Sequence, residues 1–148
     1  MIITRATEYA IRAVLFMASQ PRGEIVLKKD ICREQGITPA FLTKILQPLI
    51  KLGIVGSHRG VGGGFFLMKD PADVTLLDVI KAEEGPLHLN LCLADESHCE
   101  RELYCPVNKV WHEARAQLIE VLNRYSFAQL CEMGKNCKDP VDQLVSKL

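Results

Sequence analysis

The chain has 148 residues, of which 48% are apolar and 24% are charged, so it can bury a sizeable core and is neither disordered nor collagen-like. No apolar run approaches the roughly 18 residues of a membrane-spanning helix, and the first residues lack the pattern of a secretion signal, so we expect no membrane association and a cytoplasmic location. The net charge of zero hides an asymmetry, because residues 1–70 hold ten Lys and Arg against five Asp and Glu, whereas residues 71–148 hold eight against thirteen. A basic first half suits contact with phosphate groups.

The first predicted elements are three helices. Apolar residues recur at helical spacing over residues 5–19, and residues 27–35 form a short second helix that Gly36 closes. Thr38 then suits an N-cap and Pro39 a first helical position, and apolar residues follow every three to four positions. Two helices joined by a tight Gly-Ile-Thr-Pro turn match a helix-turn-helix.

The next segment predicts a hairpin. Two short apolar stretches at 54–55 and 65–68 indicate strands, and five glycines lie between residues 56 and 64. Glycine-rich hairpins are often plain turns, but this one directly follows a helix-turn-helix and carries His58 and Arg59. That order is typical of a winged helix.

The second half of the chain predicts a short helix, a loop and a long helix. Residues 75–83 form the short helix, residues 86–105 have little periodicity, and residues 106–125 form the long helix. Six apolar residues of the long helix alternate spacings of four and three, as in a coiled-coil seam: Val107, Trp111, Ala114, Leu118, Val121 and Tyr125. We expect this seam to pair with a second subunit, and packing against its own domain is the alternative. Residues 126–148 are expected to hold a short helix and loose residues.

The predicted fold is therefore mainly α with a small β-hairpin wing, a winged helix-turn-helix joined to a long dimerisation helix. We divide it into a DNA-binding domain at 1–85, a cysteine loop at 86–105, and a dimerisation helix with its tail at 106–148.

Double-stranded DNA is the partner that this arrangement favours. The N-terminal part of the second helix of a helix-turn-helix reads base edges, and a wing can enter the minor groove or hold the backbone. Threonine hydroxyls suit bases or phosphates, and lysines suit phosphates or guanine. For any one residue, a solvated surface position is as good an interpretation as DNA contact. The candidates are Lys28, Thr38, Pro39, Ala40, Thr43, Lys44, His58 and Arg59.

The cysteines indicate metal or redox chemistry, because cytosolic proteins seldom use them as a disulfide framework. Cys92, Cys99 and Cys105 suit an iron–sulfur cluster, for which thiolates are the usual ligands. Zinc with His98 or His112 is a second interpretation, although gaps of six and five residues exceed the usual zinc spacing. A metal-free thiol switch is a third.

The other cysteines have weaker signals. Cys131 and Cys137 also have five residues between them and suit either a second metal site or small core positions, whereas Cys32 is expected in the core. The chain has no P-loop, no nucleophile elbow and no His-Glu-x-x-His, so we expect no enzyme.

The motifs, taken in order, resemble the IscR/NsrR-type family of winged-helix iron–sulfur transcriptional regulators, over nearly all of residues 1–125. The segments that carry the resemblance are Thr7-Glu-Tyr-Ala-Ile-Arg-Ala13, Phe41-Leu-Thr-Lys-Ile-Leu-Gln-Pro-Leu49, Arg59-Gly-Val-Gly-Gly-Gly-Phe65, Thr75-Leu-Leu-Asp-Val-Ile80 and the cysteine loop. The resemblance implies a homodimer with crossed long helices, a roughly palindromic DNA site, and a 2Fe-2S or 4Fe-4S cluster held by Cys92, Cys99 and Cys105.

The fourth cluster ligand varies among such relatives. It is either an acidic residue near the N-terminus, donated by the other subunit, or a histidine three residues past the last cysteine. This chain has Asn108 at the second position, which is not a usual ligand, and Glu8 at the first, so the resemblance favours Glu8.

The expected function is thus a dimeric regulator that senses iron, redox state or nitric oxide through its cluster. Some relatives lack a cluster and sense a small molecule or a partner protein, so a metal-free thiol-responsive or small-molecule-responsive regulator of the same fold stays open. A zinc-stabilised protein-interaction module is the alternative from another class.

Overall fold

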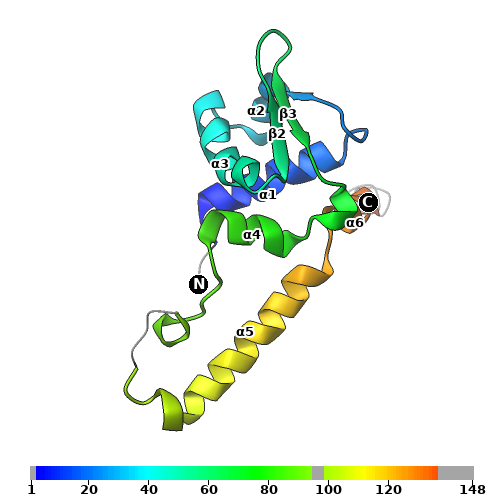
Figure 1. Ribbon diagram of the computed structural model, residues 1–148. Helices are drawn as coiled ribbons and strands as arrows, with labels where there is room; N and C mark the ends of the chain where they lie inside the picture. The colour runs from blue at the N-terminus through cyan, green and yellow to red at the C-terminus, as the bar shows by residue number, and fades with distance from the viewer. Residues whose placement is uncertain (1–2, 95–98, 137–148) are drawn as a thin grey trace, which may run out of the picture.

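Figure 1 shows the fold of the protein in a computed structural model, which describes residues 3–94 and 99–136. The helices are α1 (Arg5–Ala18), α2 (Lys28–Gln35), α3 (Pro39–Lys51), α4 (Leu76–Glu84), α5 (Pro106–Arg124) and α6 (Phe127–Asn136). The strands are β1 (Val26–Leu27), β2 (Val55–His58) and β3 (Gly64–Leu67), and three 3-10 turns are η1 (Pro71–Asp73), η2 (Leu91–Leu93) and η3 (Glu102–Tyr104). The predicted mainly-α fold with a small β wing is confirmed.

The helix-turn-helix consists of α2 and α3, which pack on α1. Gly36 ends α2 in the left-handed conformation, with a φ of 64°, and Thr38 caps α3 by accepting a hydrogen bond from the Phe41 amide. Buried apolar side chains of the three helices form one core with the base of the wing: Ala10, Ala13, Val14, Met17, Ile31, Cys32, Leu42, Ile45, Leu46, Leu49, Val55 and Phe65. Cys32 thus occupies the core position that the sequence predicts.

The wing is a three-stranded antiparallel sheet rather than a hairpin alone. Strand β3 lies in the middle, with β2 on one side and the two-residue strand β1 on the other. The sequence predicts a helix from residue 27 and misses β1, because two residues have no periodicity and become a strand only by pairing with β3. Gly64 must be a glycine, since a Cβ there would collide with the carbonyl group of Val26.

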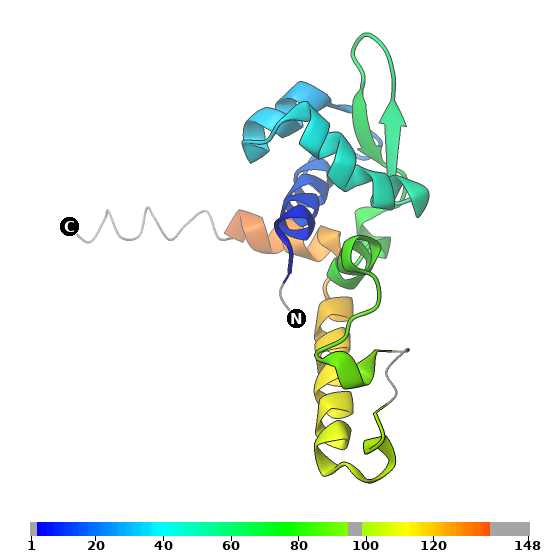
Figure 2. The same cartoon turned by 90° about the vertical axis from the view of Figure 1, so that its left-hand side faces the viewer.

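The helices α1–α4, the wing and α6 together form a unit that we call the head. The long helix α5 leaves this head on the side opposite the wing tip, as both views show (Figures 1 and 2). Its C-terminal half is attached to α4 by a small apolar cluster, in which Ile119 and Leu122 pack against Leu77, Ile80 and Leu87. The chain then turns back, and α6 packs on α1, with Phe127 fully buried in the main core.

The junction between α5 and α6 is hydrogen-bonded to the start of α4. Thr75 and Ser126 form an isolated β-bridge, the Leu76 amide donates to the Tyr125 carbonyl at 3.0 Å, and the Phe127 amide donates to the Val74 carbonyl at 2.9 Å. This bridge fixes one end of α5 to the head.

The predicted seam of α5 is partly open to solvent in the single chain. Val107, Trp111 and Val121 are 53%, 38% and 45% exposed, whereas Ala114, Leu118 and Tyr125 are half-buried. Leu122, one helical turn after Leu118, packs on the head at the edge of this seam. In the described parts of the chain, no helix has the length and apolar character that a membrane span requires.

Candidate nucleic-acid interface and cysteine loop

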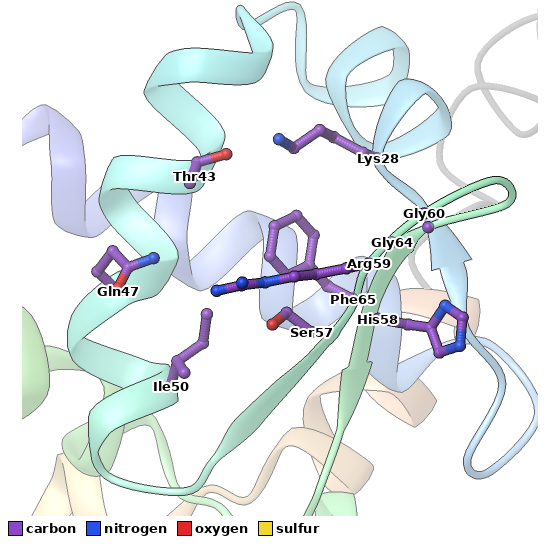
Figure 3. Close-up of a pocket in the computed structure, with 11 residues that line it drawn as sticks. Lys28, Thr43, Gln47, Ile50, Ser57, His58, Arg59, Gly60, Gly64 and Phe65 are labelled. Atoms are coloured by element: carbon purple, nitrogen blue, oxygen red, sulfur yellow. The ribbon is translucent and has the colours of Figure 1, made fainter.

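A hollow of about 340 Å³ lies between α3 and the wing. Figure 3 shows its lining, in which Thr43, Gln47 and Ile50 come from α3 and Ser57, Arg59 and Phe65 from the wing. Lys28 closes the hollow from the first residue of α2, with its Nζ 5.9 Å from the centre of the Phe65 ring. The result is a polar, cationic groove on an apolar floor.

Two neighbouring residues of the wing point in opposite directions. The guanidinium group of Arg59 reaches across the hollow towards α3, whereas the imidazole of His58 points away from α3 (Figure 3). Successive side chains of a strand alternate between its faces, so Arg59 shares its side with Ser57. Arg59 therefore lies on the same surface as α3, and His58 faces the other side of the wing.

The first turns of α3 present small polar groups. The Thr43 hydroxyl donates to the Pro39 carbonyl at 2.9 Å, and the Thr38 hydroxyl accepts from the Phe41 amide at 3.2 Å. Both oxygens keep a free acceptor position, and both methyl groups remain available. Ala40 and Lys44 are exposed on the same stretch of helix.

A second hollow of about 380 Å³ adjoins the first. It is bordered by Lys28, Lys29 and Pro39 on the helix side, and by wing glycines on the other. Within the described part of the chain, Lys28, Lys44 and Arg59 form no ion pair, whereas Arg33 is paired with Asp30 at 3.0 Å. Three cations of the head that are unpaired among the described residues, Lys28, Lys29 and Arg59, thus border the two hollows beside the wing.

The structure brings several of the predicted DNA-contact residues together and adds others. Lys28, Thr43, His58 and Arg59 border the first hollow, and Pro39 borders the second. The sequence misses Gln47 and Ser57. Their spacing could have predicted them. Gln47 lies one helical turn after Thr43 and therefore on the same face of α3, and Ser57 lies two residues before Arg59 and therefore on the same side of the wing.

The three loop cysteines are free thiols on the segment that leads into α5. Cys92 lies in η2, with its Sγ 3.2 Å from the Asn90 side-chain oxygen, Cys99 is exposed, and Cys105 directly precedes α5. Among residues 3–94 and 99–136, no three His, Cys, Asp or Glu side chains lie close enough together to hold a metal ion. The donor set still suits an iron–sulfur cluster, because all three thiols are partly or fully accessible and none is used in a disulfide.

The remaining predicted ligands are dispersed. Glu8 is exposed on the first turn of α1, 3.8 Å from the Arg12 guanidinium, and His112 is exposed on α5. His98 and Cys137 lie outside the described residues. Cys131 packs against α1, with its Sγ 3.7 Å from the Leu15 carbonyl, and burial raises the pKa of its thiol.

Two glutamates at the end of α4 have opposite environments. Glu84 accepts hydrogen bonds from Thr7 and Thr4 of the α1 N-terminus, and these bonds lower its pKa. Glu83 has a buried oxygen, Oε1, without a hydrogen-bond partner, and burial followed by the neighbouring Glu84 charge raises its pKa to about 7. The junction between the head and the cysteine loop thus holds one well-satisfied carboxylate and one that is not.

Comparison with known proteins gives consistent results. The family model Rrf2, described as an iron-dependent transcriptional regulator, matches residues 3–133. The transcriptional regulator NsrR of Geobacillus kaustophilus is 35% identical over 133 residues, which cover 89% of this chain and 90% of that protein.

Solved structures share the fold. CymR, the global cysteine regulator of B. subtilis, superposes with a TM-score of 0.72 at 26% identity, covering 90% of this chain and 98% of that one. IscR of T. potens superposes with a TM-score of 0.73 at 23% identity, covering 93% of this chain and 90% of that one.

Proposed function

The chain belongs to the Rrf2 family of transcriptional regulators, and from this premise we propose that it is a dimeric, cytoplasmic DNA-binding protein controlled by an iron–sulfur cluster. Its relatives are transcriptional regulators and not enzymes. The observation that carries the cluster proposal is the position of three unbridged thiols on the one loop that leads into the exposed long helix. The division of labour that we propose assigns residues 1–85 to DNA, 86–105 to the cluster, and 106–148 to dimerisation.

The proposed DNA contacts follow from the geometry of the head. Helix α3 enters the major groove with Thr38, Pro39, Ala40 and Thr43 near base edges. Arg59 reaches the minor groove or the backbone beside it from the wing, and His58 holds the phosphates on the outer side of the wing. Lys28 and Lys44 complete the phosphate contacts. These eight residues all lie on α3 or on the elements around the two hollows.

The proposed dimer uses the apolar seam of α5. Three of its large side chains, Val107, Trp111 and Val121, are more than a third exposed, and burying them against the same helix of a second chain removes this apolar surface from water. A two-fold axis through the crossed helices places the two α3 helices in successive major grooves of a roughly palindromic operator.

The proposed cluster ligands are Cys92, Cys99 and Cys105, with Glu8 donated by the second subunit. A 2Fe-2S or 4Fe-4S cluster supplies iron that nitric oxide or oxygen can reach where ligation by cysteine is incomplete. The loop joins α4 of the head to α5 of the dimer, so the way in which its thiols are held affects how the two heads sit. A signal changes operator affinity only if it stabilises one arrangement of the heads over the other.

The cluster is tested by anaerobic purification, followed by iron, sulfide and zinc analysis and an absorption spectrum. We expect near-stoichiometric iron and sulfide with broad visible absorbance, and loss of that absorbance in Cys99→Ala. Cys131→Ser is the matched control, because this thiol lies on α6, outside the loop, and should leave the spectrum unchanged. An unchanged spectrum in Cys99→Ala would contradict the ligand assignment.

DNA binding is tested by salt titration of operator affinity. We expect affinity to fall steeply with salt through counterion release, and Arg59→Ala to weaken binding and to reduce the salt slope by about one. Arg124→Ala removes the same charge from the far end of α5, where Arg124 pairs with Glu120, and serves as the control. No binding at low salt by either the loaded or the metal-free protein would favour the zinc-stabilised protein-interaction module.

The likeness to CymR supports a second candidate function. That protein is named as a global cysteine regulator, which fits a metal-free regulator of the same fold that responds to a small molecule or to thiol oxidation. Colourless protein without iron, recovered in the absence of oxygen, together with salt-sensitive DNA binding, would favour this candidate over the cluster sensor.

A further inference from the structure

The longest helix of the protein begins without a side-chain cap, as does the short helix α2 at Leu27, whereas three other helices are capped. Helices α1, α3 and α4 each start at a threonine whose hydroxyl accepts a backbone hydrogen bond: Thr4, Thr38 and Thr75. Helix α5 starts at Cys105, and no side chain caps it. The amides of its second and third residues therefore have neither an intrahelical nor a capping partner.

A buried side-chain donor accompanies these free amides. Asn108 is the third residue of α5 and only 7% exposed, yet its Nδ2 has no hydrogen-bond partner. It is the buried residue of a helix whose first two turns are otherwise exposed. Buried polar groups in native proteins nearly always have a partner, so the amide of Asn108 indicates an acceptor that does not lie within hydrogen-bond distance of it in the metal-free single chain.

The position of Asn108 relative to Cys105 indicates the direction in which the Asn108 side-chain amide points. In α4, the residue three after the cap, Asp78, reaches back so that its Oδ2 accepts from the Thr75 amide at 2.8 Å. Asn108 occupies the same place relative to Cys105. The side chain of the third helical residue thus lies on the turn that carries the Cys105 thiol.

The same face of α5 is covered by the turn that carries Cys92. Arg115, two helical turns after Asn108, donates to the carbonyl of Leu93 at 3.4 Å, and Leu93 follows Cys92. Helix α5 contacts η2 along this side. The donors at the start of α5 therefore lie between the two segments of the loop that bear Cys92 and Cys105.

We propose that the uncapped first turn of α5 and the amide of Asn108 form a hydrogen-bonding cradle for anionic sulfur, which is the Cys105 thiolate and the sulfide of a cluster bound beside it. Asn108 is then a positioning residue and not an iron ligand. A helix N-terminus stabilises negative charge, and N–H donors to sulfur raise the reduction potential of an iron–sulfur cluster. This inference rests on the proposed cluster, and it assigns a role to the residue that departs from the histidine ligand of relatives.

The test compares Asn108→Leu and Asn108→Asp with the wild type and with Asn123→Leu, an exposed asparagine on the same helix. We expect Asn108→Leu to lower the reduction potential of the cluster and to speed cluster loss to a chelator several-fold under anaerobic conditions. Asn108→Asp replaces the donor with an anion, so it should lower the reduction potential further and speed cluster loss more than Asn108→Leu does. Asn123→Leu should match the wild type.

Thermal unfolding of the metal-free protein separates this role from a purely structural one. Asn108→Leu removes an unpaired buried donor, so we expect the metal-free variant to be at least as stable as the wild type while its cluster is held less well. Equal potential and equal cluster retention in a coloured wild type and both variants would overturn this inference alone. A colourless wild type would overturn both it and the proposed function. Weaker dimerisation with an unchanged cluster would assign the amide to the second subunit instead, and would equally overturn the cradle.

Discussion

The DNA-binding head and the cysteine loop differ in how far the single chain caps their helices, buries their apolar side chains and pairs their polar atoms. The helices α1, α3 and α4 of the head are capped by their own threonines, and large side chains such as Leu42, Leu46 and Phe127 are fully buried. In the described residues, the buried side-chain N and O atoms without a partner belong to Glu83 in the last turn of α4 and, beyond the head, to His88 and Asn108.

The head and the loop also differ in how much apolar side-chain surface they leave exposed to solvent. Leu91, Leu103 and Tyr104 of the loop are 86%, 95% and 72% exposed, although large apolar side chains in a finished fold are mostly buried. The head thus buries most of its large apolar side chains within the single chain, whereas the loop leaves these three exposed to solvent. The proposed cluster and the proposed second subunit would both lie against this less complete region.

The largest expected effect comes from breaking the head. Phe127→Ala removes a fully buried ring from the main core, and we expect the free energy of unfolding to fall by about 3–5 kcal/mol. Tyr104→Ala in the loop is the matched aromatic truncation, with an expected change below about 0.5 kcal/mol in the metal-free protein. Denaturant unfolding measures both, and a similar loss in the two variants would show that the loop is already packed.

A smaller effect is expected at the base of the wing. Gly64→Ala places a methyl group against the Val26 carbonyl, which must push β1 away from β3 at a cost of about 1–3 kcal/mol. DNA affinity should fall as well, because Arg59 projects from the same hairpin. Gly134→Ala on α6 is the control, since its added Cβ meets no atom within 4 Å and should stabilise the helix slightly.

The N-termini of α4 and α5 allow a direct comparison of a capped helix with an uncapped one. Thr75→Ala removes the hydroxyl from the capping box of α4, and we expect a loss of about 1 kcal/mol in thermal or denaturant unfolding. Cys105→Ala sits at the equivalent position of α5, where no side chain forms a cap, so the metal-free protein should keep its stability. A comparable loss at both positions would show that the Cys105 thiol already supports the helix in the metal-free state.

The smallest expected effect depends on pH and concerns Glu83. Its folded-state pKa of about 7 lies above that of an unfolded glutamate, so the folded state holds the proton more tightly and stability falls as pH rises from about 4.5 to about 7. Glu83→Gln cannot ionise and should be more stable than the wild type at pH 8, by less than about 1 kcal/mol given its partial exposure.

The control for this measurement is Glu24→Gln, which removes one charge from an exposed loop. Melting temperatures at pH 5 and pH 8 should show the advantage of Glu83→Gln over the wild type at pH 8 and little difference at pH 5. An equal advantage at both pH values would point to packing rather than ionisation.

Local signals in the sequence predict most of the head. Gly36, Thr38 and Pro39 mark the turn of the helix-turn-helix through their own backbone and capping preferences, and the structure confirms each of these positions. Strand β1 could not be predicted in this way, because its two residues are extended only where they pair with β3.

The residues of the candidate site could be predicted from their types, but the directions of their side chains could not. The sequence identifies Arg59 and His58 together, and only the packing of the wing against α3 shows that one points towards this helix and the other away. Gln47 and Ser57 become neighbours across the hollow only when α3 and the wing pack. Likewise, spacing names three loop thiols, but among the described residues they do not come close enough together to hold a metal ion.

The β-bridge between Thr75 and Ser126 makes α5 a lever with a fixed fulcrum at the head. Its 19 residues span about 28 Å, so a movement of 1 Å at the Cys105 end corresponds to a rotation of only about 2° at the bridge. Changes of a few tenths of an ångström in bond lengths therefore rotate the head negligibly. Reorganisation of the loop over several ångströms is the scale of motion that this lever can convert into a different spacing of the two heads in the proposed dimer.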